Sequence, residues 1–261
     1  MRSRPARTLL QSAAVAAIFF VCGRASAQVN TEPLRKKLKA KGWSAMLQGS
    51  LDARAGNTRG VDVATAGGIG FSSGPHLGFL FGNAEYARYN DATSVNNSFL
   101  HARYNYEFLS WLWGEGFAQL QSDQFQRILL RDLFGVGPRF AIYQSKEIGM
   151  FYGTGYMLEH DAISVLPGAP DRADYWEHRW NNYLSLAYTL DTRVTLAETF
   201  YLQPRFDDFT DVRMLDEAAL IFKVTPVLSA SITVSFHYDA DPPTGVLRGD
   251  VDVKNALALT F

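Results

Sequence analysis

Val251-Asp252-Val253-Lys254-Asn255-Ala256-Leu257-Ala258-Leu259-Thr260-Phe261 is a stretch in which side chains of two kinds alternate. One face of an extended chain carries Val251, Val253, Leu257, Leu259 and Phe261, interrupted by Asn255, and the other carries smaller or polar residues. A period of two is typical of a β-strand. A strand that shows apolar side chains and stops on an aromatic residue suits the closing strand of a transmembrane barrel, whose lipid-facing band is flanked by aromatic girdles.

Four residues of this stretch also resemble the terminal signal that the barrel-assembly machinery recognises in bacterial outer-membrane proteins. They are Lys254, Ala256, Leu259 and Phe261. The alternative is an amphipathic edge strand that happens to come last. From the barrel interpretation we expect the assembly machinery, outer-membrane lipid and lipopolysaccharide as partners.

The other end of the sequence carries an export signal. Three arginines within residues 1–7 precede an apolar run over 13–21, and Ala25-Ser26-Ala27 forms a small-x-small cleavage site. This pattern predicts a signal peptide over 1–27, cut before Gln28. The run is shorter than the roughly 20 apolar residues that a spanning helix needs. Cys22 is the only cysteine and leaves with the signal, so we expect no disulfide.

Charge argues against a nucleic-acid partner. The 25 basic residues include four in the signal peptide, which leaves 21 against 26 acidic residues in the processed chain. A nucleic-acid-binding surface is normally basic. After Gln28 there is a basic segment over 28–42, expected to be a periplasmic leader, and no apolar stretch near 18 residues. No linker divides the remainder, so 43–261 is predicted to be one domain.

Twelve segments of that domain have strand character. They span 43–56, 58–71, 77–89, 97–109, 111–122, 127–143, 147–161, 176–190, 193–204, 211–224, 228–239 and 249–261. Their connections alternate in length for most of the chain. Those at 72–76, 110, 144–146, 191–192 and 225–227 are tight, whereas 90–96, 162–175, 205–210 and 240–248 are longer and polar. Short periplasmic turns and longer outer loops are typical of outer-membrane barrels. We therefore predict an all-β, single antiparallel transmembrane β-barrel of twelve strands with both termini periplasmic. A soluble periplasmic β-sandwich that binds a ligand is the alternative fold.

Several stretches together resemble the salt-induced outer-membrane protein family, an uncharacterised group of Gram-negative envelope proteins. They are Gly56-Asn57-Thr58, Arg103-Tyr104-Asn105-Tyr106 with Trp111 and Gln119, the run from Arg131 to Arg139 with its Gly-x-Gly, and Pro242-Pro243 with Asp250. The resemblance covers most of 43–261. It implies a β-barrel in the outer membrane and a link to osmotic stress, and it brings no reaction.

If the strand phases are right, eight charged residues point into the barrel. They are Arg103, Glu107, Glu115, Arg131, Arg139, Glu159, Arg179 and Glu217. Buried charges must pair or contact water, because an unpaired charge is costly to desolvate. One interpretation is a structural network that fills the lumen. The other is a charged constriction that selects solutes. The predicted function is thus a non-enzymatic barrel, either a narrow pore or a structural envelope protein.

An enzyme is the remaining alternative. Some outer-membrane barrels hydrolyse lipids with serine, histidine and a carboxylate at the rim, and His160 near the outer end of its strand could be approached by His101. No serine hydrolase motif accompanies them. No paired histidine or cysteine spacing indicates a zinc site. We therefore predict no catalytic residue, no metal and no cofactor.

Overall fold

The computed structural model describes residues 42–55 and 59–260 of the 261-residue chain. The predicted signal peptide, nearly all of the predicted leader, the Gly56-Asn57-Thr58 turn and Phe261 lie outside these residues. No helix within the described ranges is long and apolar enough to cross a bilayer.

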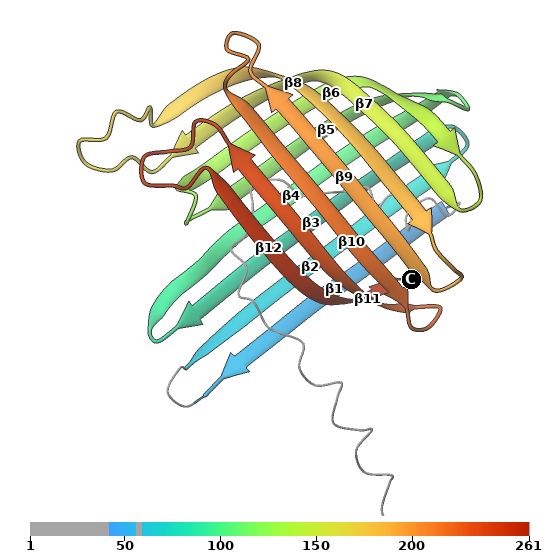
Figure 1. Ribbon diagram of the computed structural model, residues 1–261, viewed down its shortest axis with the longest axis horizontal. Helices are drawn as coiled ribbons and strands as arrows, with labels where there is room; N and C mark the ends of the chain where they lie inside the picture. The colour runs from blue at the N-terminus through green and yellow to red at the C-terminus, as the bar shows by residue number, and fades with distance from the viewer. Residues whose placement is uncertain (1–41, 56–58, 261) are drawn as a thin grey trace, which may run out of the picture.

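Twelve β-strands form one closed barrel (Figure 1). They are β1 Gly42–Arg54, β2 Gly60–Ser73, β3 His76–Tyr89, β4 Ala92–Leu109, β5 Leu112–Asp123, β6 Ile128–Gln144, β7 Ile148–Ile163, β8 Asp174–Thr189, β9 Val194–Pro204, β10 Val212–Lys223, β11 Leu228–Asp239 and β12 Gly249–Thr260. The predicted all-β fold and strand number are confirmed, and the β-sandwich alternative is wrong.

Every strand pairs antiparallel with its neighbour in sequence, and β1 pairs with β12 to close the ring. The closing register runs from Met46 opposite Thr260 to Gly49 opposite Leu257. Because the number of strands is even, the start of β1 and the end of β12 lie at the same end of the barrel as the short turns.

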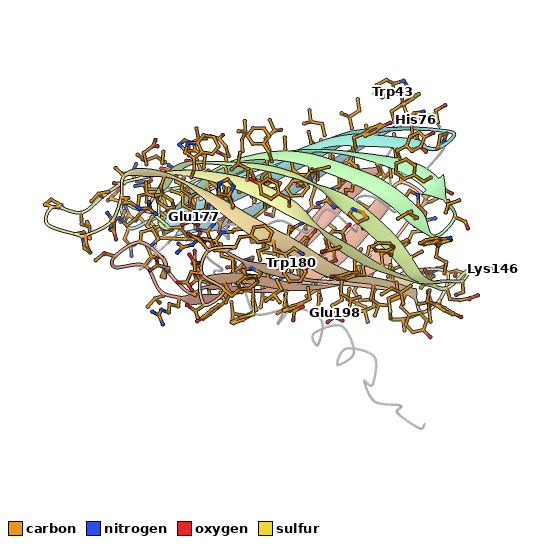
Figure 2. The ribbon with its side chains drawn as sticks, turned by 90° about the horizontal axis from the view of Figure 1, so that it is seen from above. Trp43, His76, Lys146, Glu177, Trp180 and Glu198 are labelled. Carbon is orange, nitrogen blue, oxygen red and sulfur yellow. The ribbon has the colours of Figure 1, made fainter. Side chains whose placement is uncertain are left out.

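Side chains alternate between the two faces of the wall. On β11, Ile232, Val234 and Phe236 are exposed on the outside, whereas Ser235 and His237 are buried on the inside. The same alternation runs through β3, β4, β8 and β9. Figure 2 shows Trp43 pointing away from the barrel and Glu177 lying within it. The interior is therefore lined mostly by polar residues, with an exception on β3, where Leu77, Phe79 and Phe81 point inward.

One predicted loop is wrong. Residues 90–96 were expected to form an outer connection, but Asn90 and Asp91 alone make the turn and β4 begins at Ala92. Both turn residues have positive φ, 48° and 67°, a conformation that short polar side chains tolerate. The following polar residues were mistaken for a loop, although they pair with β3 and β5 beyond the apolar band. The longer outer connections span 164–173, 205–211 and 240–248.

Glycines allow β6 and β7 to approach closely. A Cβ on Gly137 would lie 2.0 Å from the carbonyl oxygen of Thr154, and one on Gly155 would lie 2.3 Å from that of Val136. Neither partner is a flexible side chain, so no small rearrangement could relieve the overlap. Glycines in a strand commonly mark such close approaches.

We predict that Gly137→Ala destabilises the barrel by about 1–3 kcal/mol or more, because the added methyl group overlaps backbone atoms. Gly49→Ala is the matched control, since its Cβ would meet nothing closer than 3.8 Å. Urea unfolding of the refolded protein in detergent measures both. Equal stability of the two variants would contradict the packing described here.

Candidate functional site

The interior wall of the barrel is asymmetric. The inner faces of β4 to β10 carry long charged and aromatic side chains, which are buried. The inner faces of β2 and β11 are mostly small, whereas those of β1 and β12 also carry longer residues such as Met46 and Lys254. The small inward residues are Ala64, Ala66, Gly68, Gly70, Ser229, Ser231, Thr233, Ser235, Ala256 and Ala258. Toward the short turns, Phe79 and Phe81 of β3 and Phe99 of β4 reach this side of the barrel and pack with Met46 and Ala258.

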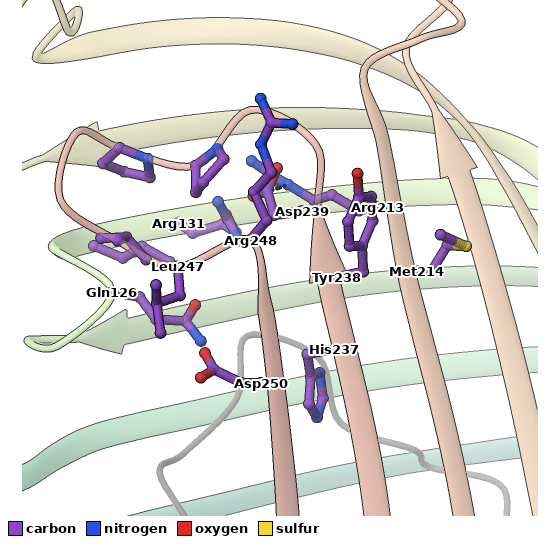
Figure 3. A pocket seen from close by; sticks show the side chains of 14 residues that line it. Gln126, Arg131, Arg213, Met214, His237, Tyr238, Asp239, Leu247, Arg248 and Asp250 are labelled. Carbon is purple, nitrogen blue, oxygen red and sulfur yellow. Dashed lines mark hydrogen bonds and ion pairs between the residues drawn. The ribbon is translucent and has the colours of Figure 1, made fainter.

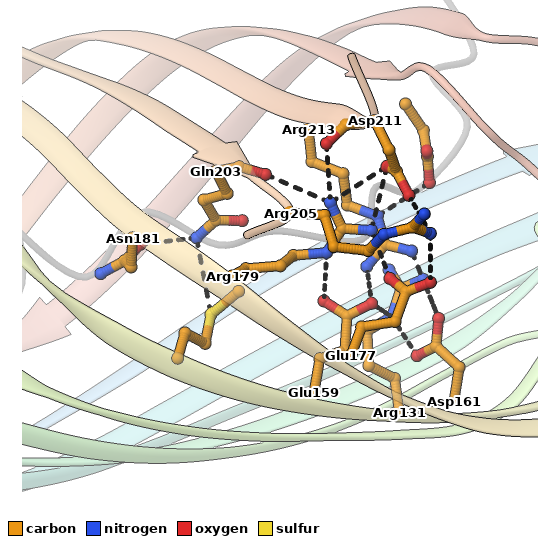
Figure 4. A network of polar contacts seen from close by, with 12 residues as sticks. Arg131, Glu159, Asp161, Glu177, Arg179, Asn181, Gln203, Arg205, Asp211 and Arg213 are labelled. Atoms are coloured by element: carbon orange, nitrogen blue, oxygen red, sulfur yellow. Dashed lines mark hydrogen bonds and ion pairs between the residues drawn. The ribbon is translucent and has the colours of Figure 1, made fainter. Parts of the chain in front are cut away.

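We call the inner faces of β4 to β10 the bulky wall. Arginines and carboxylates fill its outer half (Figure 4). We call this set the arginine–carboxylate network; its members are Arg131, Glu159, Asp161, Glu177, Arg179, Arg205, Asp211, Arg213 and Asp239. Arg131 donates to both oxygens of Asp161, from Nε at 2.6 Å and from Nη2 at 2.7 Å. Such a bidentate pair is among the stronger polar interactions in proteins.

Arg213 extends the network from β10. Its Nη1 donates to Glu159 Oε1, its Nη2 donates to Asp161 at 3.3 Å, and its Nε donates to Asp239 at 2.9 Å. One guanidinium therefore joins β7 to the end of β11. The planar fork of arginine, with five donors, makes this possible where a lysine could not.

Arg179 on β8 is the centre of the network's other half. It donates to Glu177 at 2.5 Å and to Asp211 Oδ1 at 3.1 Å, and its Nε lies 3.3 Å from Glu159 Oε2. Arg205 then contacts Glu177 at 3.2 Å and Asp211 at 2.8 Å. Every charged member thus has a partner of opposite sign, as burial requires.

The connection over 205–211 folds onto this network. Within it, Asp208 accepts hydrogen bonds from the Thr210 hydroxyl at 2.6 Å and from the Thr210 backbone N–H at 2.9 Å. These bonds hold the pKa of Asp208 below its ordinary value. Arg205 also donates to Asp207 at 2.6 Å. The acidic outer segment is therefore held by its own arginine and threonine.

A second cluster lies nearer the short turns, and we call it the Glu115 cluster. The Glu115 carboxylate accepts hydrogen bonds from Tyr183 Oη at 2.9 Å and from Asn105 Nδ2 at 2.8 Å, and Arg103 lies 3.5 Å away. Arg139 donates a hydrogen bond to Tyr183 Oη at 2.8 Å, and its guanidinium carbon lies over the Phe151 ring, 4.2 Å from the ring centroid. Tyr183 therefore connects the two ends of the cluster.

The structure brings six of the eight predicted inward charges into these two groups. Arg131, Glu159 and Arg179 belong to the network, and Arg103, Glu115 and Arg139 belong to the Glu115 cluster. Glu107 and Glu217 are half-buried on the inner faces of β4 and β10, and Glu217 accepts a hydrogen bond from Ser235 at 3.4 Å.

Sequence reasoning missed several members of the network. Asp161 follows Glu159 by two residues, Glu177 precedes Arg179 by two, and Arg213 shares the phase of Glu217. The period of two was thus a signal that could have found them. Asp211 and Asp239 stand where a strand meets an outer connection, and the structure turns both inward onto arginines.

Three outer connections are tied together at the mouth, and we call this contact the loop clasp. Thr244 donates from its hydroxyl to Asp171 at 2.8 Å. Arg127 donates to the backbone oxygens of Thr244, at 2.5 Å, and Ser164. The connections before β8 and before β12 are thereby joined, although four strands separate them around the ring.

The residues of the predicted assembly signal lie on both faces of β12. Lys254 points inward, and its Nζ donates to Glu85 on β3 at 2.8 Å. Ala256 also faces inward and is half-buried, whereas Leu259 is exposed on the outside. Phe261 lies outside the described residues.

The two histidines of the enzyme alternative lie on opposite faces of the wall. His101 is buried inside the barrel, 3.2 Å from Gln119, and stacks on Phe99. His160 faces outward between Asp132 at 2.9 Å and Asp174 at 3.2 Å. The expected approach of the two is therefore wrong. Among the described residues no group of three or more histidine, cysteine or acidic side chains is placed to hold a metal ion.

A cavity of about 40 Å³ lies at the outer mouth (Figure 3). Its lining includes Arg131, Arg213, His237, Asp239 and Asp250, with the connection over 242–248 above them. A smaller cavity of about 20 Å³ lies deeper, beside His101, Arg103 and Met157. Both cavities mix charged and polar side chains with apolar ones, among them Leu247 in the first and Leu215 in the second, and each is large enough to hold water.

Comparison with known proteins gives a family and a fold. The model of a family described as "Protein of unknown function, DUF481" matches residues 49–261. No curated protein matches the chain. Among solved structures, the translocator domain of the autotransporter NalP from Neisseria meningitidis has a TM-score of 0.50 at 10% identity, over 87% of this chain and 91% of that one.

Two porins are also similar, at lower scores. The NanC porin has a TM-score of 0.46 at 12% identity, over 83% of this chain and 97% of that chain. The KdgM porin in complex with disordered oligogalacturonate has a TM-score of 0.45 at 11% identity, over 84% and 99%. At these identities the similarity concerns the barrel fold.

We predict that Arg131→Gln costs about 3–5 kcal/mol of stability, because it leaves the buried Asp161 without its bidentate partner. Arg88→Gln is the control, since the side chains of Arg88 and its partner Asp91 are 51% and 100% exposed; an exposed pair is worth about 0–1 kcal/mol. Urea unfolding compares them. Similar small losses in both variants would show that the network contributes little to stability.

Proposed function

Because the chain belongs to the family described as "Protein of unknown function, DUF481", whose description assigns no activity, we propose its function from its geometry. The protein is a non-enzymatic pore in the Gram-negative outer membrane, narrow enough to pass only small hydrophilic solutes. The observation that carries this proposal is the asymmetric interior: a wall of ion-paired charges faces a wall of small residues.

The outward face supports placement in a bilayer. Its exposed residues are large and apolar on nearly every strand, for example Leu80, Leu100, Val136, Leu184 and Ile232. In water such a continuous apolar belt would drive aggregation. In a membrane it is the surface that lipid requires, while the backbone is satisfied by closure of the ring. The predicted export signal over 1–27 is consistent with this destination.

The interior supports a pore over a filled barrel. Eight-stranded barrels are just wide enough for side chains to fill, and barrels of about 16 strands leave a water channel. Twelve strands lie between these limits, so side-chain size decides. Here the inner residues of β2 and β11 are mostly short, and Ser231, Thr233 and Ala256 keep part of their surface accessible. The aromatic side chains that cover Met46 and Ala258 lie toward the short turns, so the outer half of this side is the more open one.

A structural envelope protein is the second candidate, and burial of the network favours it. Arg139, Arg179, Glu159 and Asp161 have almost no exposed surface. A hydrolase is a weaker candidate, because the histidines proposed for it are separated by the barrel wall. The link to osmotic stress rests on the resemblance alone and stays part of the proposal.

We predict ion conductance for the purified protein in planar bilayers, and a loss of conductance in Thr233→Trp, because the indole would fill the space beside the small-residue wall. Val234→Trp is the matched control, since Val234 faces outward on the same strand. A silent parent protein, combined with the stability loss expected for Arg131→Gln, would support the structural candidate instead.

We also predict that the processed chain begins at Gln28 and fractionates with the outer membrane. Removing Phe261 should lower the amount of folded barrel, because the closing strand loses its interfacial aromatic residue. Heat-modifiable migration on a gel measures folding, and Phe209→Ala, which removes an exposed aromatic side chain from the connection over 205–211, is the control. Normal assembly without Phe261 would count against our interpretation of the terminus.

A further inference from the structure

The interior carries a second set of carboxylates outside the arginine–carboxylate network. Glu85 lies on β3, Asp123 ends β5, and Asp250 and Asp252 lie at the start of β12. All four are in the outer half of the barrel, and their charges are close enough to act on one another. We call them the Asp252 group.

Asp252 is the member of this group with the least compensation. It is 1% exposed, and neither of its carboxylate oxygens accepts a hydrogen bond. Asp123, at 2% exposure, accepts from the backbone N–H groups of Phe125 and Gln126 through Oδ1, while its Oδ2 accepts none. A buried acceptor without a donor is uncommon in proteins and calls for a reason.

Among the described side chains, the cation that acts on Asp252 is Lys254, and its ammonium is bound to Glu85 at 2.8 Å. Arg131 and Arg213, which line the mouth cavity with Asp250, are held by Asp161, Glu159 and Asp239. Arg248 is exposed and lines the same cavity (Figure 3). The group therefore leaves a negative potential at the entrance to the small-residue wall.

Such a potential attracts cations without trapping them. Rings of aspartate or glutamate select cations in channels, and transport requires binding weak enough for release. Consistent with this, none of the described acidic and histidine side chains are clustered tightly enough to chelate a metal ion. Buried charges are also screened less by salt than exposed ones. Asp252 can therefore attract a cation in the cavity although Asp250, and not Asp252, lines it.

We propose that the Asp252 group makes the pore selective for small monovalent cations, such as alkali metal ions and short alkylammonium ions. This inference rests on the proposed pore and names its solute class. It assigns the bulky wall a structural role and the Asp252 group the selective one, with Asp250 nearest the passing ion.

The test is the reversal potential across a planar bilayer with a KCl gradient. The parent protein should favour K⁺ over Cl⁻. Asp252→Asn should lower the permeability ratio by less than the roughly fivefold effect of one unit charge about 4 Å from an ion in water, because Asp250 and not Asp252 lines the cavity. Glu198→Gln is the matched control: it removes the same charge from the outward face of β9 (Figure 2), where no solute passes, and the ratio should not change.

The outcomes separate the two proposals. No conductance at all would overturn the pore, and the solute class with it. Conductance that prefers Cl⁻, or a ratio that Asp252→Asn and Glu198→Gln change equally, would overturn the cation inference and leave the pore standing. Asp252→Asn should also unfold at the same or a higher urea concentration than the parent, because it removes repulsion and no hydrogen bond. A marked loss of stability would show that Asp252 has a structural partner.

Discussion

Closure of the ring by the β1–β12 hydrogen bonds is the constraint on which the rest of the structure depends. An open sheet with this sequence would expose two edges and could bury neither its apolar nor its polar face. Once Met46–Gly49 pair with the end of β12, each strand has two neighbours and one face is separated from the other. The outside can then be apolar and the inside charged, and both conditions are satisfied by the same period of two.

The charges inside are the second consequence of closure. Residues such as Glu159 and Arg179 cannot reach bulk water. Their charges must therefore be stabilised by ion pairs and hydrogen bonds with one another. The network meets this condition by drawing partners from β6, β7, β8, β10 and the connection over 205–211. The small-residue wall carries few long side chains, so the carboxylates beside it cannot all be compensated. The lengths of the inward side chains therefore decide on which side of the barrel the buried charges are paired and on which side they are not.

The period of two made the fold predictable. The twelve segments with strand character and the lengths of their connections predicted the number of strands and the barrel. Alternation, as in β8, β11 and β12, predicted which face of the wall each charged side chain takes, because successive residues of a strand point to opposite faces. Contacts between strands were less predictable. The partner of Arg213 depends on the stagger between β7 and β10, which no local pattern contains. Phe79 and Phe81 also point inward, where they pack with Met46 and Phe99, and alternation could not reveal this because Leu80 on the opposite face is equally apolar.

The loop clasp has a mechanical consequence. Strand pairing fixes the circumference of a barrel but leaves its cross-section free to flatten, because hydrogen-bonded strands can hinge about their common edge. Through Asp171 and Thr244, and through Arg127, the clasp joins parts of the rim that are four strands apart in the ring of twelve. The clasp fixes one chord of the opening. Thermal flattening of the barrel into an oval should therefore be smallest at the outer mouth and increase toward the end with the short turns.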